Sequence, residues 1–254
     1  MSVCGYFGKI PLERDFIFHG LPTRTMDAWA DVMAAWMAAS RAVERSRWSE
    51  RYYSAPIWRF VVGRGQIDGD CWLGIVAASV DAVGREFPFA VLISADLDLM
   101  KSQPIPFLDR LLDTLERPML SFIEGDLGQD EFRSLIQTAA NQMQQGANGP
   151  NASDASSIIL PRSRDDGICL SYEKPEGGGL AIQSLHSLPS QKKDDPAGSP
   201  CLWWHDRDAG RPGEYCVTKS LPKVSNAAPY FLGNWGAHGW SPERLEDYFS
   251  ETPD

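Results

Sequence analysis

Two neighbouring apolar segments constrain the fold of this chain more than any other feature. The segments CWLGIVAASV (71–80) and FPFAVLIS (87–94) contain almost only small or apolar residues. This composition is typical of strands that are buried on both faces of a sheet. The linker between them, DAVGRE, includes the Asp and Gly residues that turns favour. We therefore expect the two segments to form an antiparallel pair of strands.

Three further segments have the apolar period of amphipathic helices. They cover residues 24–46, 104–125 and 129–145, where apolar side chains recur every three or four residues. Pro118 lies inside the second segment and is expected to kink or split that helix, because proline lacks a backbone N–H donor. The apolar positions of the first segment are Met26, Trp29, Met33, Trp36 and Val43.

The order of these segments predicts the fold class. Because helices and strands do not alternate strictly along the chain, a doubly wound parallel sheet is not expected. We predict an α/β fold, specifically a three-layer αβα sandwich with a mixed, largely antiparallel sheet. Additional strands are expected at 55–63, 157–161, 168–172, 180–185, 201–205 and 215–219, and two short helices at 226–235 and 241–250.

Length and local composition indicate the domain organisation. A chain of 254 residues can form one large domain or two small ones. Two stretches rich in small and polar residues, 144–157 and 189–200, have the character of linkers. The sequence contains no internal repeat. We expect a single domain over residues 1–254, with the two stretches as internal linkers.

Charge and hydropathy argue against two classes of partner. The formal net charge is -10 and the sequence pI is about 4.9. Nucleic acids and anionic lipids both require basic surface, so neither is an expected partner. The longest apolar runs are shorter than the roughly 20 residues of a membrane-spanning helix, and the N-terminus lacks the pattern of a signal peptide. We therefore expect a cytoplasmic protein that does not insert into a membrane.

The motifs of common catalytic and cofactor sites do not fit this chain. GYFGK (5–9) contains a Gly-Lys pair, but a phosphate-binding loop needs a longer glycine spacing and a following Ser or Thr. The GxSxG motif of serine hydrolases is missing. His205 and Asp206 are adjacent, but no second histidine lies at the spacing of a metal site. We expect no catalytic residue, metal ion or cofactor.

Two carboxylates near arginines leave two interpretations open. Asp15 follows Arg14 in ERDF, and Asp81 lies four residues before Arg85 in SVDAVGREFP. One interpretation is a general acid and base. The other is that these groups pair with each other or bind loop amides, and it is the one we favour. In particular, we expect Asp15 to pair with Arg85 or to accept a hydrogen bond from a loop amide.

The adjacent residues Trp203 and Trp204 are candidates for contact with a partner. They lie in the apolar segment CLWWH, which has the character of a strand. Neighbouring residues in a strand point to opposite faces of the sheet. Two interpretations are open: both indoles are core residues, which is the default for tryptophan, or one of the two is exposed and available to a partner.

Several motifs resemble one known family. GYFGKIPLERDFIFHGLP (5–22) is similar to the N-terminal signature of the TagF family, also called ImpM-like, which is associated with bacterial type VI secretion. The similarity continues in APIWRF (55–60), in SVDAVGREFPF (79–89) and, more loosely, in CLWWH and SLPKVSNAAPYFLG near the end. One position departs from the family pattern, because Arg14 stands where the family has glycine. If that glycine has a positive φ, arginine is unfavourable there and the turn must differ.

The resemblance implies a function that the motifs alone do not. Family members are cytosolic post-translational repressors of type VI secretion assembly, and they are not known enzymes. The resemblance therefore implies a regulator that acts by protein–protein binding to the forkhead-associated scaffold protein of the system. It also implies the αβα sandwich. The alternatives are a structural subunit of a larger apparatus, or a small-molecule-sensing or enzymatic domain with a pocket near Lys9, Asp15, Asp81 and Arg85.

Overall fold

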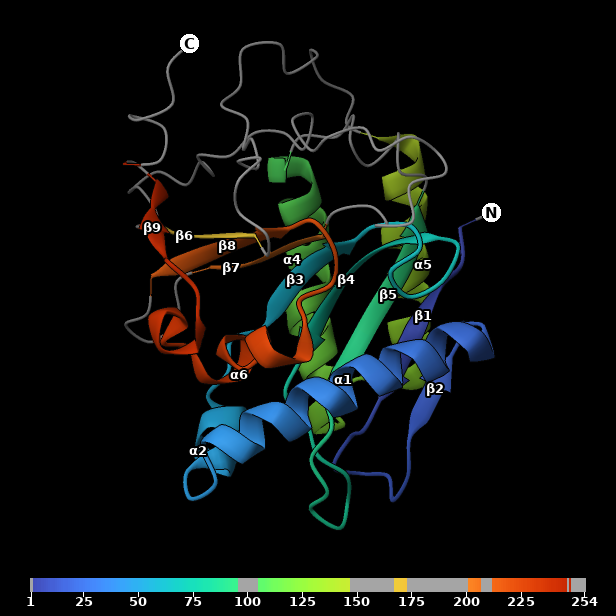
Figure 1. Cartoon of the computed structure of the whole chain (residues 1–254). Coiled ribbons are helices and arrows are strands. Elements are labelled where there is room, and N and C mark those ends of the chain that lie inside the picture. Colours follow the sequence, from blue (N-terminus) through green and yellow to red (C-terminus); the bar gives the residue numbers. More distant parts are fainter. Residues whose placement is uncertain are drawn as a thin grey trace.

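A nine-stranded sheet lies between two layers of helices in the computed structural model of the chain (Figure 1). The expected α/β fold, a three-layer αβα sandwich, is confirmed. The structure describes residues 2–95, 105–146, 167–172, 201–206, 212–245 and 247. The strands are β1 (Cys4–Gly8), β2 (Ile17–His19), β3 (Trp58–Val62), β4 (Cys71–Ala77), β5 (Phe89–Ala95), β6 (Ile168–Tyr172), β7 (Cys201–His205), β8 (Gly213–Thr218) and β9 (Glu243–Arg244). The helices are α1 (Thr23–Val43), α2 (Trp48–Tyr53), α4 (Ile105–Glu124), α5 (Gln129–Gln145) and α6 (Pro229–Leu232), with 3-10 turns η1 (Val224–Asn226) and η2 (Trp235–His238).

The sheet has the strand order β2-β1-β5-β4-β3-β7-β8-β6-β9. Its neighbouring strands are antiparallel, except that β9 runs parallel to β6. The predicted pair β4–β5 is present, with Cys71 opposite Ala95 and Ala77 opposite Phe89. The sheet is therefore mixed and largely antiparallel, as the sequence predicted.

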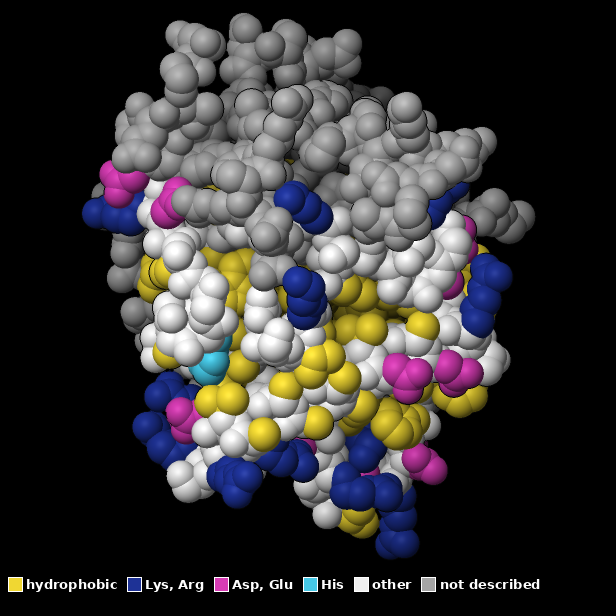
Figure 2. Space-filling view, in the orientation of Figure 1, with side chains coloured by type: hydrophobic (Ala, Val, Ile, Leu, Met, Phe, Trp, Pro, Cys, Tyr) yellow, Lys and Arg dark blue, Asp and Glu magenta, His cyan; other side chains and the backbone are white. Residues whose placement is uncertain are grey.

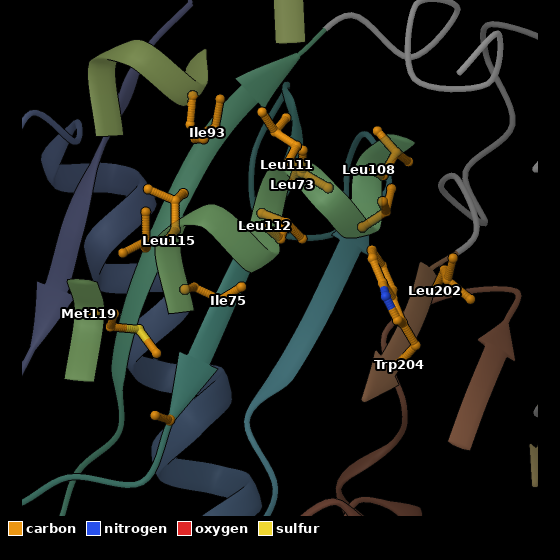
Figure 3. Packing of buried hydrophobic residues seen from close by; sticks show 14 of the residues in the cluster. Leu73, Ile75, Ile93, Leu108, Leu111, Leu112, Leu115, Met119, Leu202 and Trp204 are labelled. Carbon is orange, nitrogen blue, oxygen red and sulfur yellow. The ribbon is translucent and has the colours of Figure 1, made fainter. Parts of the chain in front are cut away.

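The two faces of the sheet carry separate hydrophobic layers. Alternate residues of a strand point to opposite faces. Leu73 and Ile75 of β4 face α4, where they lie near Leu112 and Leu115 (Figure 3). The neighbouring Trp72 belongs to the layer beneath α1, α2 and α6. The predicted burial of β4 and β5 on both faces is therefore explained by helices on both sides.

Proline does not divide helix α4. Pro118 lies inside this helix, which runs without interruption from Ile105 to Glu124. The expectation that Pro118 splits the helix is therefore wrong. Leu115 and Met119 on either side of the proline are buried against the sheet. Tertiary packing of this kind supplies most helix stability in a folded protein and outweighs one missing backbone hydrogen bond.

Other elements differ from the sequence-based expectation in their type. Strands β1 and β2 and the short helix α2 were not expected. The segment 241–250 was expected to be helical. Glu243 and Arg244 instead form strand β9, whose pairing with β6 satisfies backbone groups at that edge, whereas Leu245 and Asp247 are helical. The expected strands 157–161 and 180–185, the linker 189–200 and most of the linker 144–157 lie outside the described residues.

None of the helices in the described part of the chain combines the length and the apolar character that a membrane span requires.

Candidate functional site

The two most specific sequence motifs meet at one end of the sheet. Strand β1 ends at Gly8 and is antiparallel to β5, which begins at Phe89. The loop after β1 therefore lies beside the loop before β5. The backbones approach so closely that a Cβ on Gly8 would lie 2.4 Å from the carbonyl oxygen of Pro88. The Ala82 amide donates a backbone hydrogen bond to the Glu13 carbonyl at 2.8 Å, which joins the two loops at a second point, further from the strands.

A buried carboxylate lies at the centre of this junction. Asp81 accepts hydrogen bonds from Lys9 Nζ at 3.0 Å and from Arg85 Nε at 2.6 Å. It also accepts from the amides of Val83 and Arg85, at 3.1 and 2.8 Å. Burial by itself raises the pKa of Asp81, but these hydrogen bonds outweigh it and hold the pKa well below its usual range. The carboxylate is therefore ionised at neutral pH and fixes both loops.

The carboxylate of Asp15 does not take part in the ion pairs of this junction. It is exposed, and its Oδ1 accepts a hydrogen bond from the Phe16 amide at 2.8 Å. The expected bond to a loop amide is therefore present, whereas Arg85 pairs with Asp81 instead. The structure thus brings together three of the four predicted residues, namely Lys9, Asp81 and Arg85.

Arg14 is accommodated without backbone strain. In the described part of the chain, Asn234 is the sole non-glycine residue with a positive φ, so Arg14 does not have one. The carbonyl of Arg14 accepts a hydrogen bond from the Arg85 guanidinium. Position 14 contributes its backbone to the junction, and its side chain is exposed. Any residue can provide that carbonyl, which explains why arginine is tolerated where the family has glycine.

The joined loops and strand β2 carry exposed hydrophobic side chains. Leu12, Phe16, Phe18 and Val83 are exposed by 62%, 37%, 60% and 59%, and we call these four residues the apolar tip. Phe16 stacks on Phe7 with ring centroids 5.1 Å apart, so its position is fixed. Figure 2 shows hydrophobic and basic side chains together at the lower end of the molecule, where Figure 1 places these loops. Exposed apolar groups on an ordered frame are typical of protein-binding surfaces.

Both indoles of the Trp-Trp pair are buried. Trp203 and Trp204 are exposed by only 1% and 0%. Trp203 packs beneath α1, with its ring 5.4 Å from that of Trp36, and Trp204 donates from Nε1 to Asp109 of α4 at 2.8 Å. The two side chains do point to opposite faces, and the default interpretation that both are core residues is confirmed, whereas the alternative that one is exposed is wrong. Helices cover both faces of the sheet at this position.

A buried arginine that the sequence analysis did not identify joins three elements. Arg59 of β3 has a side chain exposed by only 3%. Its guanidinium lies 2.7–3.1 Å from carboxylate oxygens of Asp109, Asp113 and Glu116 on α4 and of Asp206 after β7. Burial lowers the pKa of Arg59, but these carboxylates outweigh that effect and raise it. The available signal was a single arginine inside an otherwise apolar strand, which requires buried acidic partners.

Two cavities of the described part of the chain lie away from the ion pairs of the loop junction. One cavity of 280 Å³ lies between α2 and α6, and another of 330 Å³ lies between α4 and α5. Neither is lined by Lys9, Asp15, Asp81 or Arg85. The ionic groups of the junction bind one another, and these cavities give no support to the alternative of a pocket beside them.

Comparison with known proteins agrees with this architecture. Residues 5–139 match the model of a family described as the TagF N-terminal domain, type VI secretion system-associated. The crystal structure of PA0076 from Pseudomonas aeruginosa PAO1 is similar, with a TM-score of 0.58 over 91% of this chain and 94% of that chain. The sequences are 20% identical, so this likeness establishes the shared fold. No curated protein sequence matches the chain.

Proposed function

Because the chain belongs to the TagF N-terminal domain family of type VI secretion-associated proteins, we propose that it regulates secretion by binding a protein partner. In this proposal the chain is a cytoplasmic repressor of the assembly of the secretion system. Its partner is the forkhead-associated scaffold protein. Binding alone is sufficient for repression, and the chain catalyses no reaction.

The observation that carries this proposal is the construction of the apolar tip. Exposed hydrophobic side chains on loops are normally costly, because they leave apolar surface in water. Here the loops are fixed by Asp81, which binds Lys9, Arg85 and two backbone amides. Little conformational entropy is lost when such a preorganised surface binds, so more of the gain from apolar burial becomes affinity. The ion pairs therefore support a binding surface, and they are not the reacting groups.

A set of substitutions in the tip tests the proposal. Leu12, Phe18 and Val83 are all more than half exposed, so changing all three to serine leaves the core intact. We expect the triple variant to melt like the unaltered protein, to lose capture of the forkhead-associated scaffold, and to raise secretion as gene deletion does. The matched control is Val43→Ser on α1, because Val43 is 56% exposed and is not part of the tip. Normal capture and repression by the triple variant would exclude the tip as the binding surface.

A further inference from the structure

The cavity of 280 Å³ between α2 and α6 is distinct from the apolar tip. Four separate segments of the chain line it, and they bring a cation, an anion, an amide and an aromatic ring to one small space. We infer that this cavity binds a small zwitterion with an apolar body, of the class of free apolar α-amino acids. The residues that carry the inference are Arg51, Trp58, Glu214, Pro229, Leu232 and Asn234.

Arg51 provides a cation that has no salt-bridge partner in the described part of the chain. It lies on α2 and is partly buried. Arg47, immediately before this helix, differs, because its guanidinium binds Glu50 at 3.0 Å. Glu214 lines the same cavity but forms no salt bridge with Arg51. The Arg51 guanidinium can therefore bind the planar carboxylate of a ligand through two parallel hydrogen bonds.

Glu214 provides the opposite charge. Its Oε2 lies 3.0 Å from His205 Nε2, and this contact fixes the carboxylate at the wall of the cavity. A carboxylate has several acceptor sites, so the second oxygen remains able to accept a hydrogen bond from an ammonium group. A ligand without an ammonium group would leave the second oxygen of Glu214 without a donor when it displaced water, and a ligand without a carboxylate would leave Arg51 without an acceptor; either loss is costly.

The remaining lining is apolar and rigid. The Trp58 indole is held by a hydrogen bond from its Nε1 to the Tyr230 carbonyl, at 2.8 Å. Pro229 and Leu232 of α6 lie on the same cavity. A fixed ring and a proline lose little entropy on binding, and together they form a surface that suits an apolar side chain.

The backbone beside the cavity is held in an unusual conformation. Asn234 has φ 55 and ψ 54, in the left-handed region, and it follows Gly233, which has φ 66. Asparagine is one of the few non-glycine residues that adopt the left-handed conformation readily, and here it immediately precedes the 3-10 turn η2. Here this conformation places an asparagine at the cavity that already contains Arg51 and Glu214.

The second cavity lacks this combination of charges. The cavity of 330 Å³ between α4 and α5 is lined by Arg110 and by neutral side chains, without a carboxylate. It therefore does not offer the paired recognition that a zwitterion requires. This contrast restricts the inference to the cavity beside α2.

Isothermal titration calorimetry of the full chain tests the inference with four compounds. L-leucine and L-phenylalanine contain both charged groups and an apolar side chain. Phenylacetate lacks the ammonium group and phenethylamine lacks the carboxylate. We expect binding of at least one amino acid, and binding of each single-charge compound weaker by about tenfold or more, which is the loss expected for a charged hydrogen bond. No binding of either amino acid at millimolar concentration, or equal binding of phenylacetate, would overturn the inference.

Substitution of Arg51 links the binding to the cavity. Arg51→Gln removes the charge without breaking a salt bridge to any of the described residues, so we expect normal folding and about tenfold weaker binding of the amino acid. Arg47→Gln is the matched control, because Arg47 is nearby but does not line the cavity. Unchanged binding by the Arg51 variant would place the ligand elsewhere and contradict the inference. Glu214→Gln is the complementary variant, and its melting temperature checks that the loss of the His205 contact has not unfolded β8.

Discussion

At the scale of single residues, Gly8 determines how closely the two motif loops approach. Its φ is +149°, and a Cβ there would lie 2.4 Å from the Pro88 oxygen and 2.6 Å from the Phe89 Cα. Both contacts are with backbone, which cannot move aside as a flexible side chain does. We expect Gly8→Ala to lower the free energy of unfolding by about 2 kcal/mol or more, as measured by urea denaturation. The control Gly69→Ala should have little effect, since a Cβ on Gly69 meets no atom within 4 Å.

The pKa of Asp81 leads to a pH-dependent prediction. The folded pKa is held well below the unfolded value of about 4. A carboxylate of this kind stabilises the fold above its unfolded pKa, and the contribution disappears as the pH falls through the folded pKa. We therefore expect Asp81→Asn to lower the melting temperature at pH 7, with a gap to the unaltered protein that narrows below pH about 4. If the difference in melting temperature between the two proteins were the same at pH 7 and below pH about 4, the charge of Asp81 would not be the property that stabilises the fold.

The matched control for this experiment is Asp15→Asn. Asp15 is exposed and makes one hydrogen bond to the Phe16 amide, which the oxygen of asparagine can also accept. The melting temperature of the Asp15→Asn variant should remain close to that of the unaltered protein, both at pH 7 and below pH about 4. The comparison separates the buried carboxylate from an exposed one in the same motif region.

At the scale of elements, Arg59 connects β3 to α4 and to the end of β7. Four carboxylates share its guanidinium, including Glu116, whose pKa is raised by burial although Arg59 opposes the rise. Arg59→Met would leave these carboxylates facing one another across the helix–sheet interface. We expect a loss of about 3 kcal/mol in urea denaturation at pH 7, in the range for breaking a buried ion pair.

Substitution of a single carboxylate, Asp113, is the control for Arg59→Met. Asp113 is 69% exposed, and ion pairs of exposed groups contribute about 1 kcal/mol or less. Asp113→Asn should therefore change stability little. A loss as large as that of Arg59→Met would mean that one pair, and not the whole cluster, holds the helix to the sheet.

The elements that could be predicted from the sequence are those whose own residues show a clear apolar pattern, without reference to distant parts of the chain. Strands β4 and β5 are apolar along nearly their whole length, and α1 repeats its apolar residues at the helical period, so all three elements were predicted at nearly their observed places. Strand β1 was missed because Gly5 and Gly8 weaken a strand pattern, although both are needed where other backbone lies close. The acidic partners of Arg59 come from distant parts of the chain, and local periodicity carries no information about them.

At the scale of the whole molecule, a short series of hydrogen bonds connects the cavity to the tip. Tyr52 follows Arg51 on α2, and its hydroxyl donates to the Ser79 carbonyl at 2.9 Å and accepts from the Ser79 amide at 3.0 Å. Ser79 Oγ in turn donates to the carbonyl of Lys9 at 2.7 Å. All three bonds are buried. Helix α2, which lines the cavity, is thus bonded directly to the loop before β5 and, through Ser79, to the loop after β1.

This connection predicts the consequence of removing one hydroxyl. Tyr52→Phe keeps the ring but leaves the buried amide of Ser79 without its partner, while the Ser79 carbonyl still accepts from the Phe87 amide at 3.1 Å. We therefore expect a loss of about 1–3 kcal/mol of stability. We also expect faster amide hydrogen exchange in the loops around Lys9 and Asp81, because their anchor to α2 is lost. Tyr53→Phe is the control, since Tyr53 is 53% exposed. If exchange in the loops is unchanged in Tyr52→Phe, the Asp81 ion pairs alone hold the tip, and the cavity and the tip are mechanically independent.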